Sequence, residues 1–436
     1  MSLRATSDAR RSEPVELSAD QLDLTAYVRP GDRLVWGQGP AEPHSLTSAL
    51  VEQRAAIVGD GERLGIFLAV TLGDSMKAEY ADHFRYFGLG GLGQTSRLTK
   101  VGAVEVMPTR LGAVTRLIRS GRLRFDVVLV QLSDPRDGIC STGLVGDMLQ
   151  DAIRSARVVI GEVNPNVPFS RGDTQVALSD LDVVVRSDAP LPPWPAARVS
   201  DDAQRIAEQI AELVPDGATL QMGIGAIPEA FAAAATGKRD LGLHSGMVGD
   251  AVIELVESGA VTNARKPIDT GVSVTGLAFG TERLVRWIDD NPEVVLRSID
   301  HTHGIRPLSA LPDLWAINSA IEIDLTGQVN AETMGGVYAG GIGGQLDFVD
   351  AAIGSEAGRS VIALPSTAAR GSVSRIVPRL ADGIVTTPRG SADLFVTEYG
   401  VADLRGATIA DRARAMIAIA HPDHREDLER AARTLL

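Results

Sequence analysis

The chain of 436 residues has a single cysteine, Cys140. One cysteine excludes a disulfide within the chain and a cysteine-based zinc site, because both need several thiols. We therefore expect an intracellular protein, since secreted chains commonly carry disulfides. No apolar run reaches the roughly 18 residues of a membrane-spanning helix, and the stretch from Met1 to Asp20 lacks the apolar core of a signal peptide. These absences predict a cytoplasmic protein with no membrane partner.

Positive charge is also scarce relative to negative charge. Lys and Arg number 42 against 56 Asp and Glu, which gives a formal net charge of -14. Nucleic acids and anionic membranes are bound by clustered Lys and Arg, so both are excluded as expected partners. A small anionic ligand held by a local site remains compatible with this charge.

The length and one proline-rich stretch predict two domains. A single core usually stops growing well below 436 residues. The segment "SDAPLPPWPAARVSD" contains four prolines, which cannot continue a helix or lie in a central strand. We place the boundary there, with one domain over residues 1–190 and a second over 191–436.

The two halves resemble one another. Gly31, Gly37 and Gly39 recur as Gly217, Gly223 and Gly225, each displaced by 186 positions (217 - 31 = 186). "LGIFLAVTLGD" in the first half corresponds to "LGLHSGMVGD" in the second. The repetition predicts two related open domains with a shared site in the cleft between them.

Local patterns favour an α/β fold. "DVVLVQL", "RVVIGEV" and "SVIALP" are short apolar runs typical of strands buried on both faces of a parallel sheet. "DDAQRIAEQIAELV" places Ile206, Ile210 and Leu213 on one face of a helix, and Ser200 precedes it as a candidate N-cap.

Two glycine loops are candidates for ligand binding. "LQMGIGAIPEA" has the order strand, Gly-x-Gly and helix, and the helix N-terminus offers N–H groups to an anion or a developing oxyanion. A dinucleotide site would need a third glycine where Pro228 stands and an acid after the next strand, whereas Asp240 precedes that strand. "AGGIGGQLDF" is the densest glycine loop, and is either a flexible turn or a backbone nest facing a ligand.

Several segments in order resemble the acetyl-CoA hydrolase/transferase family, which includes 4-hydroxybutyrate, butyrate and succinate:acetate CoA-transferases. They are "QMGIGAIPEA", "SDPRDGICSTG", "GEVNPNVP", "INSAIEIDLTGQVNAE", "GGIGGQLDF", "GSVSRIVP" and "VTEYGVADLRG". The resemblance implies two α/β domains of the CoA-transferase fold, an acyl-CoA thioester as substrate in the interdomain cleft, no permanently bound cofactor and a homodimer. It also implies which residues line the CoA and supply N–H groups near the thioester oxygen: Gly223, Ile224, Gly225, Gly341, Gly343, Gly344 and Gln345.

The resemblance also locates a departure. Family members carry a nucleophilic glutamate in a His/Tyr-Thr/Ser-Glu pattern, where it attacks the thioester and becomes a glutamyl-CoA thioester. Here the segment reads His244-Ser245-Gly246, and Asp250 keeps its place. A glycine cannot attack a thioester. We therefore expect an open space beside Gly246, with His244 as general base for direct transfer of the acyl group to water or another small nucleophile.

Two other hypotheses stay open. A different carboxylate could supply the nucleophile for ordinary CoA transfer, and the candidates are Glu229, Glu322, Asp324 and Glu332. Alternatively, the chain binds acyl-CoA without catalysis.

Three further side chains have simple interpretations. Ser245 is a weaker nucleophile candidate, because neighbours on a strand point to opposite faces. Cys140 fits a small buried residue better than a reactive thiol. His301 and His303 lack a third ligand, so no metal site is predicted.

Overall fold

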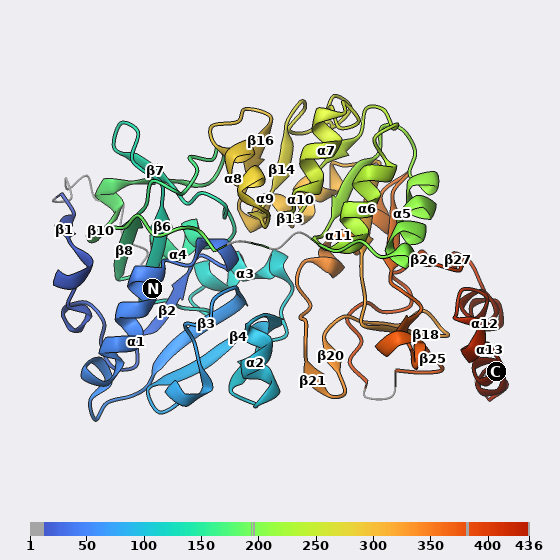
Figure 1. Ribbon diagram of the computed structural model, residues 1–436, viewed down its shortest axis with the longest axis horizontal. Helices are drawn as coiled ribbons and strands as arrows, with labels where there is room; N and C mark the ends of the chain where they lie inside the picture. Colours follow the sequence, from blue (N-terminus) through green and yellow to red (C-terminus); the bar gives the residue numbers. More distant parts are fainter. Residues whose placement is uncertain (1–12, 193, 195–196, 381–382, 435–436) are drawn as a thin grey trace. The chain divides into compact units, whose positions relative to one another are not determined.

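The computed structural model describes residues 13–434 apart from 193, 195–196 and 381–382. The chain divides into two compact units. Unit 1 comprises Met1–Trp194 and Thr275–His301, and unit 2 comprises Pro195–Val274 and Thr302–Leu436. Figure 1 shows the chain from blue to red, and the yellow segment returns to unit 1.

This division differs from a single cut after residue 190, because Thr275–His301 belongs to unit 1. The hydrogen bonds of that segment explain its placement. Gly146 N donates to Gly276 O at 2.8 Å, and Ala278 N donates to Leu144 O at 2.9 Å. Each backbone donor and acceptor needs a partner, and here the partners lie in unit 1.

Unit 1 is built on an eight-stranded sheet in the order β1-β10-β8-β6-β2-β3-β4-β5, with every neighbouring pair parallel. The strands are β1 (Val15–Leu17), β2 (Arg33–Trp36), β3 (Leu64–Thr71), β4 (Phe84–Gly93), β5 (Val104–Val106), β6 (Val127–Leu132), β8 (Val158–Val163) and β10 (Val183–Arg186). The central strands β6 and β8 are buried along their whole length. They are the apolar β-branched runs that the sequence indicates, as expected for strands covered on both faces.

Unit 2 is built on a six-stranded sheet in the order β12-β11-β17-β22-β26-β27. Its strands are β11 (Thr219–Met222), β12 (Gly242–Leu243), β17 (Leu314–Asn318), β22 (Arg359–Ala363), β26 (Leu394–Thr397) and β27 (Gly400–Asp403). All neighbouring pairs are parallel except β26 and β27.

The same strand order occurs in both units. The run β10-β8-β6-β2-β3 in unit 1 corresponds to β26-β22-β17-β11-β12 in unit 2. β2 and β11 occupy equivalent places and are displaced by 186 residues (219 - 33 = 186). Gly31 and Gly217, which precede them, share a positive φ of 80° and 82°. The predicted α/β class is confirmed, and the glycine repeat marks the loops around equivalent strands.

Helices flank both sheets. In unit 1 they are α1 (His44–Val58), α2 (Thr95–Lys100), α3 (Leu111–Arg119), α4 (Leu149–Ser155) and α8 (Glu282–Ile288). In unit 2 they are α5 (Asp201–Leu213), α6 (Ala226–Ala234), α7 (Ala251–Glu257), α10 (Ile305–Ser309), α11 (Gln345–Gly354), α12 (Ile409–Ala418) and α13 (Pro422–Ala432), while α9 (Ile299–Thr302) ends at the junction of the units. None of the helices in the described part of the chain is both long and apolar enough to cross a membrane.

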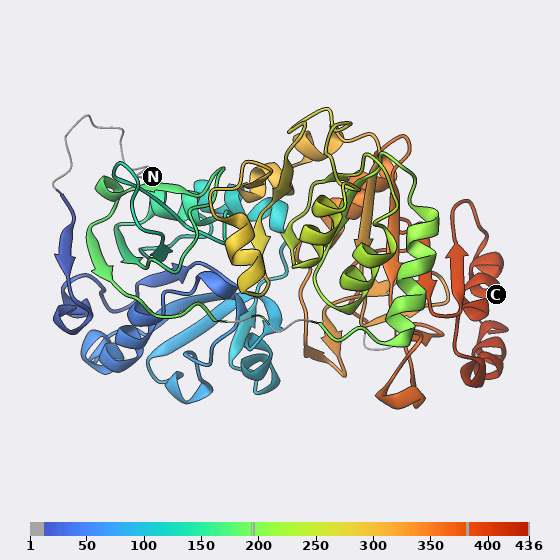
Figure 2. The same ribbon diagram turned by 45° about the horizontal axis from the view of Figure 1, so that its top comes forward.

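The helix α5 shows how sequence fixes local structure. Ser200 caps it as predicted, because its hydroxyl accepts a hydrogen bond from Ala203 N at 3.2 Å. Ile206 and Ile210 are buried, while Leu213 is half-buried. The helix packs beside α6 and against β26 (Figure 2).

Short strands complete both units. In unit 1, β7 (Ile139–Ser141) pairs with β9 (Gln175–Ala177). In unit 2, β18 (Glu322–Asp324) lies between β19 (Val329–Asn330) and β25 (Ile376–Val377). The remaining short strands are β13 (Met247–Val248), β14 (Ser273–Thr275), β15 (Leu277–Ala278), β16 (Val294–Leu296), β20 (Thr333–Met334), β21 (Val337–Tyr338), β23 (Thr367–Ala368) and β24 (Val373–Ser374).

Candidate active site

The predicted site segments of unit 2 follow the carboxyl ends of two adjacent parallel strands. Gly223 follows β11, and His244 follows β12, which pairs with β11. Ligands of open parallel sheets bind at this edge. The topology therefore brings two of the predicted segments together although they are about 20 residues apart in sequence.

The first glycine loop has room above its backbone. Gly223, Ile224 and Gly225 are half-buried, and a Cβ atom added to either glycine would meet nothing within 4 Å. Gly225 has a φ of 117° and precedes the first residue of α6. A ligand can therefore approach this backbone closely, next to the first N–H groups of α6, which have no acceptor within the helix.

The side chain of Ser245 is bound to the main chain. Ser245 is fully buried, and its hydroxyl oxygen lies 2.7 Å from Met222 O and 2.8 Å from Met247 O. Its backbone N donates to Val274 O at 3.0 Å. These bonds fix the segment after β12 against the end of β11, which is a structural task for this hydroxyl.

His244 is fully buried and bonded to a neighbouring segment. Its Nε2 lies 3.2 Å from the carbonyl oxygen of Thr302. A carbonyl only accepts, so Nε2 carries a hydrogen and donates it to Thr302 O. This hydrogen bond fixes the position of Thr302, the residue immediately before His303.

The space beside Gly246 is filled, contrary to the expectation of a vacancy. A Cβ atom built on Gly246 would lie 2.6 Å from Nε2 and 2.7 Å from Cε1 of His303. Real Cβ atoms essentially never approach other atoms so closely. The imidazole of His303 therefore lies where a side chain at position 246 would begin.

The same imidazole contacts the second glycine loop. A Cβ atom on Gly344 would also overlap the ring at Nε2 and Cδ2 of His303. Gly344 is the N-cap of α11, and Phe348 in that helix packs on the imidazole with ring centroids 4.8 Å apart. His303 thus joins Gly246 and Gly344, two predicted site residues that are 98 positions apart (344 - 246 = 98).

His303 is missing from the predicted site residues. In the sequence it resembles only an incomplete metal ligand, and a lone histidine between α9 and α10 carries no pattern that points to the loops it contacts. A hint exists in retrospect, since glycine stands at both positions where a side chain would collide with it.

The electrostatic surroundings keep His303 uncharged. Burial, followed by the neighbouring His244, lowers its pKa from 6.5 to about 3. The side chain is only 5% exposed, and a charged ring in this place would lose its hydration. At neutral pH the site therefore contains a neutral imidazole.

The second glycine loop continues into α11. Gly341, Gly343 and Gly344 are half-buried, and Gly343 has a φ of 55°. The Nε2 amide group of Gln345 is buried without a hydrogen-bond partner in the described structure. Buried donors are normally paired, so this amide has an unused hydrogen bond to offer a ligand.

Lys266 supports the segment that carries His244. Its buried Nζ donates to Leu243 O at 2.9 Å and to Val272 O at 2.6 Å, which ties the end of β12 to a neighbouring loop. Burial lowers the pKa of Lys266 from 10.5 to about 8.

Two candidate carboxylates stabilise turns. Asp324 accepts hydrogen bonds from Thr326 N at 2.8 Å, Thr326 Oγ1 at 2.7 Å and Gln328 N at 3.0 Å. Glu322 accepts one from Asn330 Nδ2 at 3.1 Å. Both carboxylates are therefore used by the local backbone and side chains.

The other two candidates differ in their links to the glycine loops. Glu229 in α6 accepts a bond from the backbone of Ala251. Glu332 is buried and accepts from Thr386 Oγ1 at 2.8 Å, and burial raises its pKa. The main-chain oxygen of Glu332 accepts from Ala339 N and Gly340 N, so this residue fixes the base of the second glycine loop.

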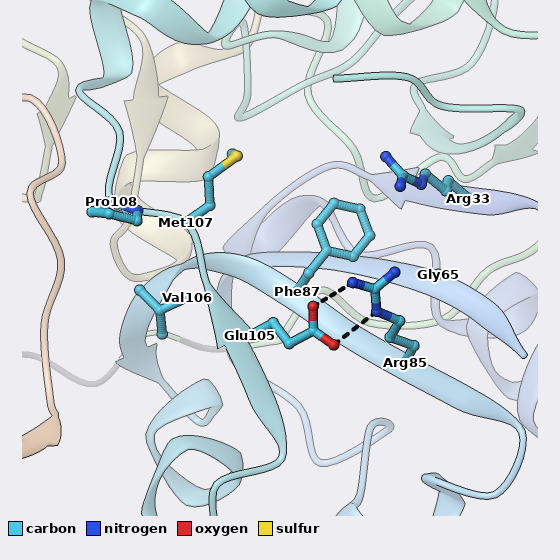
Figure 3. Close-up of a pocket in the computed structure, with 8 residues that line it drawn as sticks. All are labelled: Arg33, Gly65, Arg85, Phe87, Glu105, Val106, Met107 and Pro108. Carbon is cyan, nitrogen blue, oxygen red and sulfur yellow. Dashed lines mark hydrogen bonds and ion pairs between the residues drawn. The ribbon is translucent and has the colours of Figure 1, made fainter. Parts of the chain in front are cut away.

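Unit 1 has a pocket of about 350 Å³, but none of the predicted site residues line it. Figure 3 shows its walls, where the guanidinium of Arg85 pairs with the carboxylate of Glu105. Nε of Arg85 donates to Glu105 at 2.7 Å, so the charges offset each other. Cys140, also in unit 1, is buried, and its burial raises the thiol pKa to about 11. Neither feature offers a charged nucleophile.

The uncharged state of His303 predicts a pH effect on stability. The folded pKa lies below the unfolded one, so its contribution is complete above pH 6.5 and decreases as the pH falls toward 3. Between pH 6.5 and 5 we expect the wild type to lose about 2 kcal/mol more free energy of unfolding than His303→Gln. Urea unfolding of both proteins at the two pH values measures this. Equal losses would contradict a buried neutral His303.

Lys266 predicts an effect at alkaline pH. Its folded pKa also lies below the unfolded one, so stability rises as the pH increases from 8 to 10.5. Over this range we expect the free energy of unfolding of the wild type to rise by up to about 3 kcal/mol more than that of Lys266→Met. Urea unfolding at pH 8 and 10 measures the difference in free energy of unfolding between the two proteins. The contributions of all other titrating groups cancel in this difference. A difference that does not change with pH would show that Nζ is hydrated.

Comparisons with known proteins agree with this architecture. The model of the acetyl-CoA hydrolase/transferase N-terminal domain matches residues 10–193, and the C-terminal domain model matches 280–432. The chain is 39% identical over 398 residues to the 4-hydroxybutyrate coenzyme A transferase of Clostridium kluyveri, covering 91% of this chain and 92% of the relative. It is 33% identical to the succinyl-CoA:cyclohexane-1-carboxylate CoA transferase of Geobacter metallireducens, covering 99% of both.

A solved structure is similar over the whole length. RipA from Yersinia pestis superposes with a TM-score of 0.89 at 32% identity, covering 100% of this chain and 99% of that one. The family matches span both units, and the relatives are CoA-transferases. The chain therefore belongs to the acetyl-CoA hydrolase/transferase family and is an acyl-CoA transferase or hydrolase.

Proposed function

We propose that the protein binds an acyl-CoA thioester and moves the acyl group directly to water or a small acceptor, without a covalent intermediate on residue 246. The observation that carries this proposal is the packing at Gly246. Position 246 has no nucleophile, and the imidazole of His303 fills the space in which a side chain would stand. The CoA thioester is the substrate, and no resident cofactor is required.

The glycine loops suit a thioester. Main-chain N–H groups of Gly223, Ile224 and Gly225 adjoin the start of α6, and those of Gly344 and Gln345 adjoin the start of α11. Such donors stabilise the oxyanion of a tetrahedral intermediate, because they are fixed before the reaction begins. Direct attack by water would then form this intermediate, and its collapse would expel the CoA thiolate and leave the free acid, whereas attack by a small carboxylate would leave an acyl anhydride. By family likeness we expect the active protein to be a homodimer.

His244 keeps the role of general base in this proposal. Nε2 of its ring donates to Thr302 O, so the proposal assigns the transfer of the proton to Nδ1. Ser245 is assigned no chemical step, since its hydroxyl bonds the main chain at Met222 and Met247.

A second candidate function is ordinary carboxylate CoA transfer through Glu332. This glutamate fixes the base of the second glycine loop through its carbonyl oxygen, and burial raises the pKa of its carboxyl group. A carboxylate with a raised pKa is a stronger nucleophile, but it must be ionised to attack. Glu332 would then form the anhydride and the glutamyl-CoA thioester in place of residue 246.

Thiol release from a panel of acyl-CoA esters tests the proposal, with and without acetate as acceptor. Direct transfer to water predicts release without acetate. Borohydride reduction during turnover, followed by peptide mapping, should then find no reduced glutamate. Release only with acetate, together with a reduced Glu332, would support the second candidate instead.

The assay also addresses a protein that binds without catalysis. Such a protein would be protected by acyl-CoA against thermal unfolding but would release no thiol with any acceptor. That result would contradict both enzymatic candidates.

A further inference from the structure

The imidazole of His303 lies with one edge between two glycines. Its Cε1 and Nε2 face Gly246, while its Nε2 and Cδ2 face Gly344. Nε2 belongs to both contacts, so this nitrogen lies where the segment after β12 meets the start of α11. The start of α11 belongs to a glycine loop assigned to the thioester above, and the segment after β12 carries His244.

The opposite edge of the ring is held by Thr302. Nδ1 of His303 lies 2.8 Å from Thr302 Oγ1, and the carbonyl oxygen of Thr302 accepts from His244. When the threonine hydroxyl donates to Nδ1, the hydrogen of the neutral ring is on Nε2. In that arrangement the Thr302 hydroxyl sets the tautomer, and Phe348 packs on the ring.

We propose that His303 is a further catalytic residue, an uncharged imidazole whose Nε2–H donates a hydrogen bond to the carbonyl oxygen of the bound thioester. This inference rests on the proposed function. The donor lies against Gly344 at the start of α11, so it adds a side-chain hydrogen bond to the main-chain N–H groups there. Together they stabilise the negative charge that develops on the oxygen when the acceptor attacks.

A donor role fits the surroundings better than a base or nucleophile role. A ring whose pKa is lowered to about 3 has little affinity for a proton at neutral pH and is a poor base. The same lowering ensures that the ring stays neutral and has a single N–H, which lies on the edge that faces Gly246 and Gly344. The start of α11, a helix of 10 residues, adds positive potential that also disfavours an imidazolium ion.

The packing also explains why glycine stands at position 246. A carboxylate side chain there would have to pass through Nε2 and Cε1 of His303. A glutamate at 246 would therefore require the imidazole of His303 to leave the position it has here. The protein has the imidazole at this point of the site. In this proposal the site therefore offers the thioester a hydrogen-bond donor here and no nucleophile for covalent attack.

Substitution of His303 tests the donor role through turnover of acyl-CoA in the thiol-release assay. We expect His303→Ala to lower kcat by about a hundred- to a thousandfold, the loss typical of one oxyanion donor, with a much smaller change in KM. His303→Gln should retain kcat within about tenfold of the wild type, because its amide can donate but cannot accept a proton as a base does.

Two glycine variants provide a matched pair in α11 and its cap. Gly344→Ala places a methyl group against Nε2 and Cδ2 of His303, so it should displace the ring and lower kcat. Gly354→Ala, at the other end of the helix, meets nothing within 4 Å and should leave kcat unchanged. If His303→Ala does not fold, His303→Gln and Gly344→Ala carry the test.

The outcomes separate this inference from the proposed function. Wild-type turnover with an unchanged kcat in His303→Ala would overturn the role of His303 and leave direct transfer intact. A loss in His303→Gln as large as in His303→Ala would overturn the donor role. Absence of wild-type turnover without a carboxylate acceptor, with a reduced glutamate in the peptide map, would overturn both.

Discussion

The site depends on one steric constraint: where the imidazole of His303 lies, a side chain at position 246 has no room. Closely packed interiors leave no room for both, and a shift of the ring would be resisted by Thr302, Phe348 and Gly344. The absence of a carboxylate at 246 is therefore part of a packing arrangement. It forms only when the segments that carry Gly246, His303 and Gly344 pack together.

The repeated sheet explains how these segments come together. Parallel strands carry their following loops to one edge, so the loops after β11 and β12 meet although β12 is only two residues long. Lys266 and Ser245 then fix the segment after β12 through main-chain bonds. The residues proposed to contact the ligand can be glycines because neighbouring side chains hold the backbone in place.

Much of the fold could be predicted from the sequence, because its signals are local or periodic. The apolar runs of β6 and β8, the cap at Ser200 and the displaced glycines each depend on neighbouring residues or on a repeat. The return of Thr275–His301 to unit 1 could not be predicted, since its backbone bonds to Leu144 and Gly146 leave no pattern in the sequence.

The candidate site, like the fold, could be predicted from the sequence only in part. Gly246 stands out because the surrounding motif predicts another residue there. His303 is 57 positions further along the chain (303 - 246 = 57), and only the fold shows that it enters the same space. The expectation of an open vacancy was wrong for this reason: a missing side chain says nothing about which distant residue replaces it.

Turnover of acyl-CoA in heavy-oxygen water tests the central claim most directly. Direct transfer to water predicts that the heavy oxygen appears in the released acid and that the mass of the protein is unchanged after many cycles. Heavy oxygen in an aspartate or glutamate of the recovered protein would show that a carboxylate attacks the thioester, and this would contradict the account.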